Sequence, residues 1–531
     1  MKNIILIGFM GSGKDSVGKE ISRRSGPAFI STDRMIELAE NRCIDDIFQQ
    51  NGESYFRHLE KRALRSIRRL QNSIIATGGG MVIDEKNRKQ LSRLGIVVHL
   101  YTDTETVRRR LQNDRTRPLL KEGNAVERLL SERKELYNFA DIVIDTRSKT
   151  PEQIAGDILS KVKIKDSKKI SSEPECINIK TASSTYDVII GENDVTQLTD
   201  FLQVRPKSCA VISNPLVAAL YLDPVADQLD KAGIEVVPVI VPDGERYKTL
   251  KTVSKIYDVL LKHHFDRSDI VLGLGGGVIT DIAGFVAATL KRGCRLVNVP
   301  TTLLAQVDAG VGGKTGVNHP LGKNLIGSFY QPDLVLADVQ LLKTLSEREF
   351  RNGLAEVIKV AVIGDETLFN LLVNRRDEIL ARESNSLREI VTRCVRYKRD
   401  IVQEDEKEST GRRSLLNFGH TIGHMIEAKN HYRGVKHGEA VAMGMVMEAK
   451  IALRIDGFTN HDVQRITDLI ASYNLPISSP HKFSSDDIKR YMLQDKKIRN
   501  GKLNLPTLSA IGESHIKELE WNRFVSFMDQ I

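Results

Sequence analysis

Short, continuously apolar runs alternate with charged, amphipathic stretches over the first 160 residues of the chain. The runs Ile4–Ile7, Ile74–Thr77 and Ile96–Tyr101 have the composition of parallel strands that are buried on both faces. Asp141–Asp145 follows the same pattern. The stretches between the runs have the spacing of helices, so residues 1–163 are predicted to form an α/β domain around a parallel sheet.

A second alternation of strand-like and helix-like segments begins near Tyr186–Ile190 and continues through Ala210–Ile212, Glu235–Val241 and Asp269–Leu274. Between the two regions, residues 164–175 are mostly polar and lack apolar periodicity, which predicts a linker. Beyond about residue 345 the strand signals fade and helical periodicity dominates. The pattern therefore predicts a second α/β part over residues 176–338 and a mostly helical part over residues 339–531.

Composition narrows the class of protein. Hydrophobic residues make up 41% of the 531 positions and charged residues 28%, as in a globular protein. No apolar run approaches the roughly 18 residues needed to span a bilayer, and no small-residue cleavage site follows the first apolar stretch, so neither a membrane segment nor a signal peptide is expected. The five cysteines are scattered and form no C-x-x-C pair, which favours a cytoplasmic protein and argues against a thiolate zinc site.

The formal net charge of +9 raises the question of a nucleic-acid partner. The basic residues are spread along the chain, and no aromatic-rich basic motif accompanies them. Several lie beside glycines or acids, where a small anion could bind. Anionic metabolites are therefore the expected ligands, and nucleic acid is not an expected partner.

The segment GFMGSGKDS, residues 8–16, has the features of a phosphate-binding loop between a strand and a helix. Successive backbone N–H groups can wrap a phosphate chain there, and the helix N-terminus adds its dipole. Lys14 would neutralise the outer phosphates. Asp15 stands where a Ser or Thr hydroxyl normally binds Mg²⁺. The ATP-binding candidates in this loop are Gly11, Ser12, Gly13, Lys14, Asp15 and Ser16.

Further groups follow in an order that suits phosphoryl transfer to an acidic acceptor. They are Thr32-Asp33, the GESYFRHLE segment with Arg57, the triple glycine Gly78–Gly80, and later Arg110, Arg117 and Arg133. With these motifs in this order, residues 1 to about 160 resemble shikimate kinase.

The resemblance assigns roles to these residues. Asp33 would hold the acceptor hydroxyls, Arg57 and Arg133 would pair with the shikimate carboxylate, and Gly79 would let the backbone approach the ring. Arg110 would lie near the adenine, and Arg117 would belong to a lid that reaches the phosphates. The residues expected to act in catalysis are Lys14, Asp33 and Arg117.

Two positions depart from the family pattern. Asp15 replaces the hydroxyl that binds magnesium, and Ser31 replaces the first carboxylate of a DxD motif. The hydroxyl and the carboxylate have therefore changed places. Our hypothesis is a compensated site that binds Mg·ATP with Asp15 as an oxygen ligand to magnesium. The rival interpretation is a decayed kinase that is retained as a folded domain.

The densest set of chemical groups lies between residues 243 and 437. The turn Asp243–Lys248 carries acids and a lysine, and Gly275–Asp281 follows a strand and opens a helix, which suits a pyrophosphate. Glu356 and Lys359 are three residues apart on one helical face, His420 and His424 are four apart, and His437 follows. Glu, His and His can bind a catalytic zinc ion and leave one coordination position open.

Residues from about 177 onward resemble 3-dehydroquinate synthase over nearly their full length. The resemblance implies an NAD-binding α/β subdomain over 176–338 and a helical zinc and substrate subdomain over 339–531. It implies Glu356, His420 and His437 as ligands of zinc or cobalt, with His424 beside the substrate, and Arg292 reaching a neighbouring subunit's site in a homodimer. The implied NAD-binding residues are Asp243, Gly244, Glu245, Arg246, Tyr247, Lys248, Gly277, Val278, Ile279, Thr280, Asp281, Thr301, Thr302, Lys314, Lys323, Leu341, Leu342, Lys343 and Thr344.

The substrate implied by this resemblance is 3-deoxy-arabino-heptulosonate 7-phosphate. NAD⁺ would remove a hydride, phosphate would be eliminated, the hydride would return, and an internal aldol step would close the ring. Lys314, Lys359 and His424 are the expected catalytic residues. One extra residue between Glu408 and Gly411 leaves the placement of Glu408 open. The residues expected to meet the substrate are Arg292, Asp308, Lys314, Asn324, Lys359, Lys398, Arg413, Asn417, His424, Lys496 and Lys497.

The leading hypothesis is thus a bifunctional enzyme of aromatic amino-acid biosynthesis. Three alternatives remain from the sequence. The synthase could carry a kinase-like module that binds nucleotide and only regulates or scaffolds. The second part could be a related sugar-phosphate cyclase, and a basic nucleic-acid binder is the most distant option.

Overall fold

The computed structural model describes residues 2–111, 125–163, 173–492, 498–499 and 502–528. Arg117, Lys496, Lys497 and most of the expected linker lie outside these ranges. The chain divides into two compact units. One comprises Met1–Ser172, Ala210–Tyr247 and Lys343–Ser346, and the other comprises Glu173–Cys209, Lys248–Leu342 and Glu347–Ile531. The domain boundaries expected from the sequence stay a prediction.

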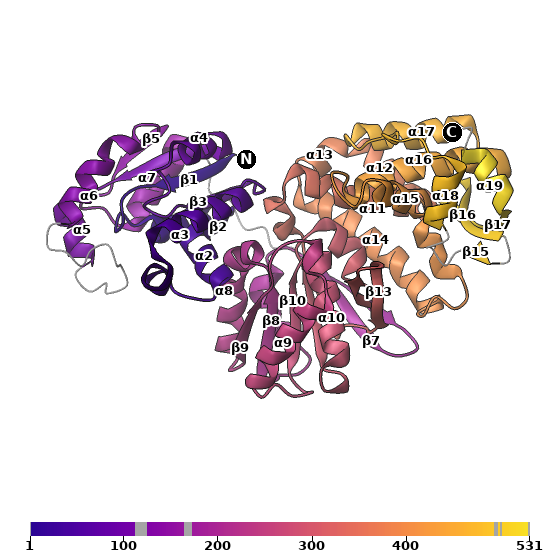
Figure 1. The fold of residues 1–531 in the computed structure, drawn as a ribbon, viewed down its shortest axis with the longest axis horizontal. Helices are drawn as coiled ribbons and strands as arrows, with labels where there is room; N and C mark the ends of the chain where they lie inside the picture. Colours follow the sequence, from indigo (N-terminus) through magenta and orange to yellow (C-terminus); the bar gives the residue numbers. More distant parts are fainter. Residues whose placement is uncertain (1, 112–124, 164–172, 493–497, 500–501, 529–531) are drawn as a thin grey trace. The chain divides into compact units, whose positions relative to one another are not determined.

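The N-terminal part is built on a five-stranded parallel sheet with the order β2-β3-β1-β4-β5 (Figure 1). Every residue of β1 is buried, as its unbroken apolar run predicts. The expected strands over Ile4–Ile7, Ile74–Thr77, Ile96–Tyr101 and Asp141–Asp145 are confirmed to within a residue or two. The strands are β1 Asn3–Ile7, β2 Ala28–Ser31, β3 Ser73–Ala76, β4 Gly95–Tyr101 and β5 Ile142–Asp145.

Helices connect these strands, and their apolar faces pack on the sheet. Val17 and Ile21 of α1 and Ile154 and Ile158 of α7 form one core cluster with Ile4 and other strand residues. A capping box at the start of α7, in which the Thr150 and Gln153 side chains bond reciprocally to the backbone, fixes where that helix begins. The helices are α1 Lys14–Ser25, α2 Thr32–Glu40, α3 Ile44–Ile67, α4 Glu85–Leu94, α5 Thr104–Leu111, α6 Ala125–Arg133, η2 Lys134–Tyr137 and α7 Pro151–Val162.

A second sheet has seven strands in the order β6-β7-β14-β11-β10-β8-β9. The edge strand β6 runs antiparallel to β7, and the ladders from β7 through β14 and β11 to β10 are parallel. A separate hairpin, β12–β13, follows β11 in sequence. The strands are β6 Glu175–Lys180, β7 Thr185–Gly191, β8 Ser208–Ser213, β9 Glu235–Ile240, β10 Ile270–Gly275, β11 Arg295–Pro300, β12 Lys314–His319, β13 Gly322–Phe329 and β14 Leu334–Asp338.

The connections of this second sheet are helical. They are η3 Asp194–Asp200, α8 Pro215–Lys231, η4 Glu245–Tyr247, α9 Leu250–Lys262, α10 Gly277–Thr289, η5 Leu290–Arg292, η6 Ala305–Ala309 and η7 Val339–Thr344. The expected strands near residues 186, 210, 235 and 269 are confirmed. The sequence patterns did not single out β11, β14 or the hairpin.

The C-terminal part is mostly helical, as expected, but it also contains a three-stranded antiparallel sheet that was not expected. The helices are α11 Glu347–Gly364, α12 Glu366–Asn374, α13 Arg376–Leu380, α14 Ser384–Glu404, η8 Arg412–Asn417, α15 His420–Lys429, α16 His437–Ile455, α17 Asn460–Ser472, α18 Ser485–Met492 and α19 Trp521–Met528. The strands are β15 Ile498–Arg499, β16 Lys502–Ala510 and β17 Glu513–Glu520.

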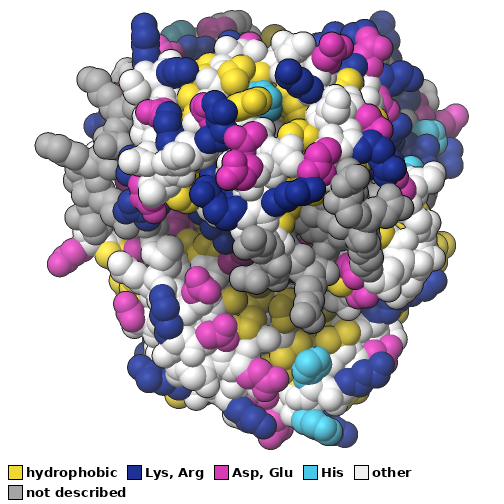
Figure 2. All heavy atoms as spheres, turned by 90° about the vertical axis from the view of Figure 1, so that its left-hand side faces the viewer, with side chains coloured by type: hydrophobic (Ala, Val, Ile, Leu, Met, Phe, Trp, Pro, Cys, Tyr) yellow, Lys and Arg dark blue, Asp and Glu magenta, His cyan; other side chains and the backbone are white. Residues whose placement is uncertain are grey.

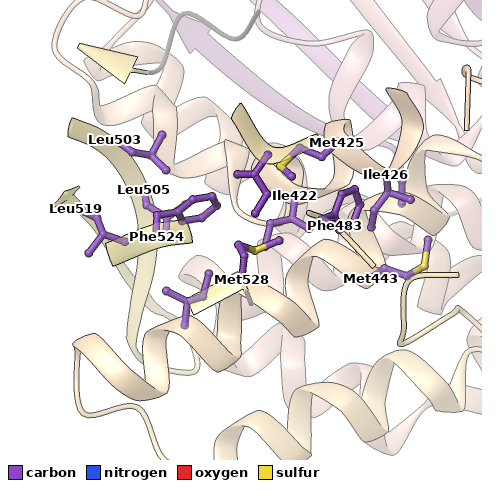
Figure 3. Close-up of a cluster of buried hydrophobic side chains, with 13 residues drawn as sticks. Ile422, Met425, Ile426, Met443, Phe483, Leu503, Leu505, Leu519, Phe524 and Met528 are labelled. Atoms are coloured by element: carbon purple, nitrogen blue, oxygen red, sulfur yellow. The ribbon is translucent and has the colours of Figure 1, made fainter. Parts of the chain in front are cut away.

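The antiparallel sheet contributes to the core that supports α15. Figure 3 shows Ile422 and Met425 of this helix among side chains from β16 and α19, including Leu505 and Phe524. All four residues are at most 1% exposed. The apolar face of α15 is therefore buried in this core, and its opposite face carries the polar side chains of the candidate site.

Many charged side chains lie on the face drawn in Figure 2. On this face, Lys and Arg side chains alternate with Asp and Glu side chains and do not gather in one region of a single sign. Among the described residues, no helix combines the length and the apolar character needed to cross a bilayer.

Candidate active sites

The segment 8–16 folds as the expected loop between β1 and α1. Gly8, Gly11 and Gly13 have φ values of 154°, 78° and 88°, which favour glycine, and Gly13 is the N-cap of α1. The Lys14 ammonium donates to the backbone oxygens of Gly8 and Phe9, each at 3.0 Å. The loop therefore curls around a lysine charge at a helix N-terminus, the arrangement that binds phosphates.

The two departures from the kinase pattern lie side by side. Asp15 is in the first turn of α1, and Ser31 ends β2 and caps α2. Ser31 Oγ is 3.5 Å from Asp15 Oδ2. The pair offers oxygen donors only, which is the ligand chemistry that magnesium prefers.

The triple glycine makes room for the acceptor-binding candidates. A Cβ on Gly78 would lie 2.4 Å from Asp33 Oδ1, and a Cβ on Gly80 would lie 1.9 Å from Arg57 Nη1. Larger residues at these positions would displace both side chains. Arg57 Nη1 in turn donates to the Glu60 carboxylate at 2.7 Å.

Arg133 and Glu60 are both buried beside these residues. Arg133 Nη1 donates to the backbone oxygen of Gly79 at 3.3 Å, and its guanidinium lies 5.9 Å from the centre of the Phe9 ring. Burial raises the pKa of Glu60 to about 7, although the charge of Arg57 opposes this shift. The sequence analysis gave Glu60 no role, and its only signal there was its position three residues after Arg57.

Arg110 lies at the other side of the phosphate loop. Its guanidinium donates to the backbone oxygens of Gly11 at 3.2 Å and Thr146 at 2.8 Å. The residue thus links the loop to the end of β5. Its partner in the expected nucleotide site, Arg117, lies outside the described residues.

The expected metal ligands converge from three helices. Glu356 belongs to α11, His420 is the first residue of α15, and His437 is the first residue of α16. Glu356 Oε1 lies 3.6 Å from His420 Nε2 and 3.4 Å from His437 Nε2. One ligand atom from each residue lies within 4.8 Å of the others.

The chemistry of this cluster fits a divalent metal ion. Glu356 is 1% exposed, and neither of its carboxylate oxygens accepts a hydrogen bond of regular geometry. Lys359 Nζ forms an ion pair with it at 2.5 Å. One carboxylate and two imidazoles suit zinc or cobalt and leave an open coordination position.

Glycines set the close approach of the two helices that carry the histidines. A Cβ on Gly444 in α16 would lie 2.0 Å from the backbone oxygen of Gly419, just before α15. The buried Glu448 carboxylate, also from α16, accepts from the N–H groups of Gly419 at 2.7 Å and Ile422 at 3.3 Å. It therefore caps the helix that begins at His420, a role that the sequence did not reveal.

His424 and Glu427 lie next to the cluster on α15. The His424 ring centre is 5.5 Å from that of His420 and 6.2 Å from that of His437. Glu427 Oε2 is 3.2 Å from His437 Nδ1. His424 is thus close to the candidate metal site, its expected place beside the substrate stays a prediction, and Glu427 is a neighbour that the sequence analysis missed.

Cations expected to hold the substrate surround Asp308. Lys398 Nζ contacts the Asp308 carboxylate and also donates to its backbone oxygen at 2.6 Å. Burial lowers the pKa of Lys398 to about 8, although Asp308 opposes this shift. Burial would raise the pKa of Asp308, but the charges of Lys398 and Lys359 outweigh it and hold that pKa below its usual value.

The structure resolves the position of Glu408. Its Oε1 is 2.7 Å from Lys314 Nζ, and its backbone takes a left-handed φ of 59°. Arg413 is 2% exposed and donates to the backbone oxygens of Glu406 at 2.6 Å and Gly312 at 2.7 Å. The extra residue is therefore accommodated while Glu408 still faces a cation. Asn417 ends η8, and Arg292 is exposed at the end of η5.

The nucleotide-binding candidates of the synthase part meet near the start of α10. Gly277–Asp281 is the first part of this helix, directly after β10, and Thr301 and Thr302 follow the neighbouring strand β11. Lys248 Nζ contacts the Asp281 carboxylate and lies 2.5 Å from Asn324 Oδ1. A helix N-terminus beside a buried ammonium group suits a pyrophosphate.

The other residues expected to bind NAD fall into two groups. Leu341 and Leu342 are buried in η7, and Lys323 on β13 forms an ion pair with Glu427 at 3.0 Å. The remaining ones belong to the other compact unit, namely Asp243, Gly244, Glu245, Arg246, Tyr247, Lys343 and Thr344.

Comparison with known proteins identifies both parts. Family models of the N-terminal and C-terminal domains of 3-dehydroquinate synthase match residues 238–352 and 353–498. A 3-dehydroquinate synthase from Acinetobacter baumannii strain AYE is 46% identical over 343 residues, which is 64% of this chain and 94% of the relative. The chain belongs to the 3-dehydroquinate synthase family. A 3-dehydroquinate synthase from Acaryochloris marina is 45% identical over 351 residues, with the same coverage.

The N-terminal part is a shikimate kinase domain, since the family model of shikimate kinase matches residues 10–163. The protein is therefore a bifunctional enzyme of the shikimate pathway, with kinase and cyclising phosphate-lyase parts in one chain.

Solved structures of related cyclases share the fold of the synthase part. A 2-deoxy-scyllo-inosose synthase complexed with carbaglucose-6-phosphate, NAD⁺ and Co²⁺ is 27% identical, with a TM-score of 0.61 over 67% of this chain and all of that chain. ValA, a 2-epi-5-epi-valiolone synthase from Streptomyces hygroscopicus with NAD⁺ and Zn²⁺ bound, is 26% identical, with a TM-score of 0.59 over 65% of this chain and 96% of that chain. The higher identity to 3-dehydroquinate synthases decides against a different cyclase.

Proposed function

We propose that both parts of this enzyme are catalytically active, the kinase with Mg·ATP and the synthase with NAD and a divalent metal ion. For the kinase, the supporting observation is the contact between Ser31 and Asp15 at 3.5 Å. The exchanged hydroxyl and carboxylate are neighbours in space, so one carboxylate and one hydroxyl remain available to magnesium. Lys14 and the start of α1 provide the positive field that phosphoryl transfer requires.

The exchange makes a specific prediction for ATP-dependent phosphorylation of shikimate by the full chain. Asp15→Ser leaves two hydroxyls and no carboxylate, so activity should fall by about 100-fold, an amount equivalent to about 2.7 kcal/mol of transition-state stabilisation. Adding Ser31→Asp restores the carboxylate and should recover most of that loss. Lys14→Ala serves as the inactive reference.

Two results would contradict this proposal. Wild-type turnover no greater than that of Lys14→Ala would show a decayed kinase. A fully active Asp15→Ser variant would show that the carboxylate does not bind the metal. The Mg²⁺ dependence of the rate, measured in each variant, shows whether a loss of activity comes from weaker magnesium binding.

For the synthase, the supporting observation is that His420 and His437 both lie close to the buried carboxylate of Glu356. Neither oxygen of that carboxylate accepts a hydrogen bond of regular geometry. These residues would hold zinc or cobalt, and the region around Lys248 and the first turn of α10 would hold NAD. When bound, the two supply Lewis acidity and a reversible hydride acceptor.

The residues of the chain provide the rest of the mechanism. Three cationic side chains are each at most 6% exposed, namely Lys359, Lys398 and Arg413. Together they would bind the phosphate and carboxylate groups of the substrate. Lys398, with a pKa of about 8, can hold or release a proton near neutral pH. His424, beside the metal ligands, is placed to exchange a proton with the reacting ring.

This function is tested by supplying 3-deoxy-arabino-heptulosonate 7-phosphate and measuring dehydroquinate and inorganic phosphate. Equal amounts of both products should form only with NAD⁺ present, and chelation should abolish their formation until zinc or cobalt is returned. Product formation that survives complete metal removal would contradict the proposed metal site.

We also propose that the synthase part forms a homodimer, in which Arg292 reaches the site of the second copy. Arg292, at the end of η5, is exposed and is therefore accessible to a second copy. Light scattering should give twice the chain mass of 59.5 kDa. A monomer with full synthase activity would contradict this assignment.

A further inference from the structure

A buried carboxylate beside the cluster of Glu356, His420 and His437 connects two parts of the synthase site. It also belongs to a second group whose ligand atoms lie within 4.8 Å of one another, namely His424, Glu427 and His437. Glu427 lies on α15 and is 4% exposed. Its Oε2 is 3.2 Å from Nδ1 of His437, and its Oε1 is 3.0 Å from Nζ of Lys323. The same side chain therefore contacts the start of α16 and the strand β13.

The first of these contacts orients a candidate metal ligand. With Nδ1 of His437 donating to Glu427, the Nε2 lone pair of that imidazole is left for the cluster around Glu356, 3.4 Å away. His420 is held in the same tautomer by the backbone oxygen of Phe418, 3.2 Å from its Nδ1. His437 has a side-chain partner instead, and its side chain is 32% exposed against 10% for His420.

The second contact leads to the nucleotide-binding candidates. Lys323 precedes Asn324 on β13, and Asn324 Oδ1 is 2.5 Å from Lys248 Nζ. Lys248 in turn contacts the Asp281 carboxylate in the first turns of α10. A continuous path of short polar contacts and one peptide link therefore runs from His437 through Glu427 to the start of α10.

We propose that Glu427 is a positioning residue that couples metal binding to NAD binding. This inference rests on the proposed function, in which both ligands occupy this site. With a metal ion bound, His437 would hold the Glu427 carboxylate in one position, and that carboxylate would hold Lys323 and the β13 strand in place for the dinucleotide. Because coupling between two sites is reciprocal, NAD must improve metal affinity by the same factor.

The path predicts different effects for three substitutions. Glu427→Gln keeps an acceptor for His437 but removes the charge that holds Lys323, so metal affinity should stay within a few-fold while coupling is lost. Glu427→Ala removes both contacts and should weaken metal binding by about 10- to 100-fold, the usual effect of losing such a partner. Lys323→Met leaves His437 oriented, so metal affinity should hold while the coupling is lost. Its NAD⁺ affinity in the absence of metal should fall, because Lys323 is itself an expected NAD-binding residue.

The experiment measures binding to the full chain after removal of metal and nucleotide. Co²⁺ is titrated by its visible absorption with and without NAD⁺, and NAD⁺ is titrated calorimetrically with and without Co²⁺. In the wild-type protein each ligand should tighten the other by the same factor, about fivefold or more. In the three variants this factor should approach one.

A matched control is Glu439→Gln on α16, close in sequence to His437. Its carboxylate pairs with Arg348 at 2.6 Å and belongs to none of the candidate sites. It should bind Co²⁺ and NAD⁺ with the wild-type coupling factor. Circular dichroism and thermal unfolding of every variant verify that the chain is folded.

The outcomes separate this inference from the proposed function. A wild-type chain that binds neither Co²⁺ nor NAD⁺ overturns the proposed function and the inference together. A chain that binds both without coupling, or whose Glu427→Gln and Lys323→Met variants keep the wild-type factor, overturns the inference alone.

Discussion

At the scale of single residues, both sites use carboxylates that are buried against a cation. Glu60 contacts Arg57 in the kinase part, and Glu356 contacts Lys359 in the synthase part, with both acids 1% exposed. Removing either cation would leave a buried charge uncompensated, which costs several kcal/mol. Pairs of this kind hold both side chains in one arrangement and determine the net charge beside a bound ligand.

The Glu60–Arg57 pair predicts a pH dependence for shikimate binding. The pKa of Glu60 is about 7, so its carboxyl is neutral below that pH and no longer competes as an anion for Arg57, which also pairs with Glu53 at 2.6 Å. Above pH 7 the ionised carboxylate competes for Arg57. The KM for shikimate should therefore rise by about fivefold as pH increases from 6 to 8 and approach a tenfold rise at higher pH, the limit set by about 1 pKa unit of interaction.

Glu60→Gln tests this explanation, since its amide cannot ionise. Steady-state kinetics of the variant should give a KM for shikimate that is nearly constant over the same pH range. A pH profile identical to that of the wild-type enzyme would assign the titration to another group.

At the scale of elements, the metal cluster depends on how closely α15 and α16 approach. Gly444 faces the backbone oxygen of Gly419, and an added Cβ would lie only 2.0 Å from that oxygen. Gly438 similarly faces the backbone oxygen of Asn352, at 2.1 Å from an added Cβ. These contacts involve backbone atoms, which cannot rotate away as a flexible side chain can.

Gly444→Ala should therefore separate His420 from His437. We expect loss of stability by about 1–3 kcal/mol or more from overpacking, together with a fall in bound zinc per chain. Thermal unfolding and metal analysis measure the two effects.

A matched substitution in another helix tests whether the loss of stability and of zinc comes from the close approach of α15 and α16. Gly156 lies inside α7, where an added Cβ would be 3.4 Å from the flexible Arg24 side chain. Gly156→Ala should stabilise its helix by up to about 1 kcal/mol, the difference in helix propensity, and leave bound zinc unchanged. Equal destabilisation by both substitutions would rule out the proposed importance of the Gly444 contact.

At the scale of the whole molecule, two activities share one chain but use separate residues. The described kinase candidates come from residues 11–133, and the metal and substrate candidates of the synthase come from residues 292–437. Neither reaction makes the substrate of the other, so the chain has no product to pass directly between its two sites.

This separation predicts selective inactivation. Lys14→Ala should abolish shikimate phosphorylation and leave dehydroquinate formation within about twofold of wild type, because sites that share no residues or partners are usually independent. His437→Ala should do the reverse. Both activities are measured on the same preparation, and loss of both through either substitution would reveal coupling between the parts.

The local structure and the order of the motifs could be predicted from the amino-acid pattern alone. The spacing of hydrophobic residues within a short segment predicts strands such as β1 and β4. In the same way, the placement of glycines predicts the phosphate loop and the start of α10. The candidate metal cluster was also singled out from the sequence, since Glu and His residues suit a metal ion. The resemblance to 3-dehydroquinate synthase implied Glu356, His420 and His437, which lie close together in the structure.

Only the tertiary structure decided which distant residues meet. The contact of Asp15 with Ser31, the burial of Glu60, the pairing of Glu408 with Lys314 and the link through Glu427 all join separate elements. The C-terminal antiparallel sheet behind α15 arises in the same way. Such contacts depend on packing between segments far apart in the chain, and hydrophobic period within one segment contains no information about them.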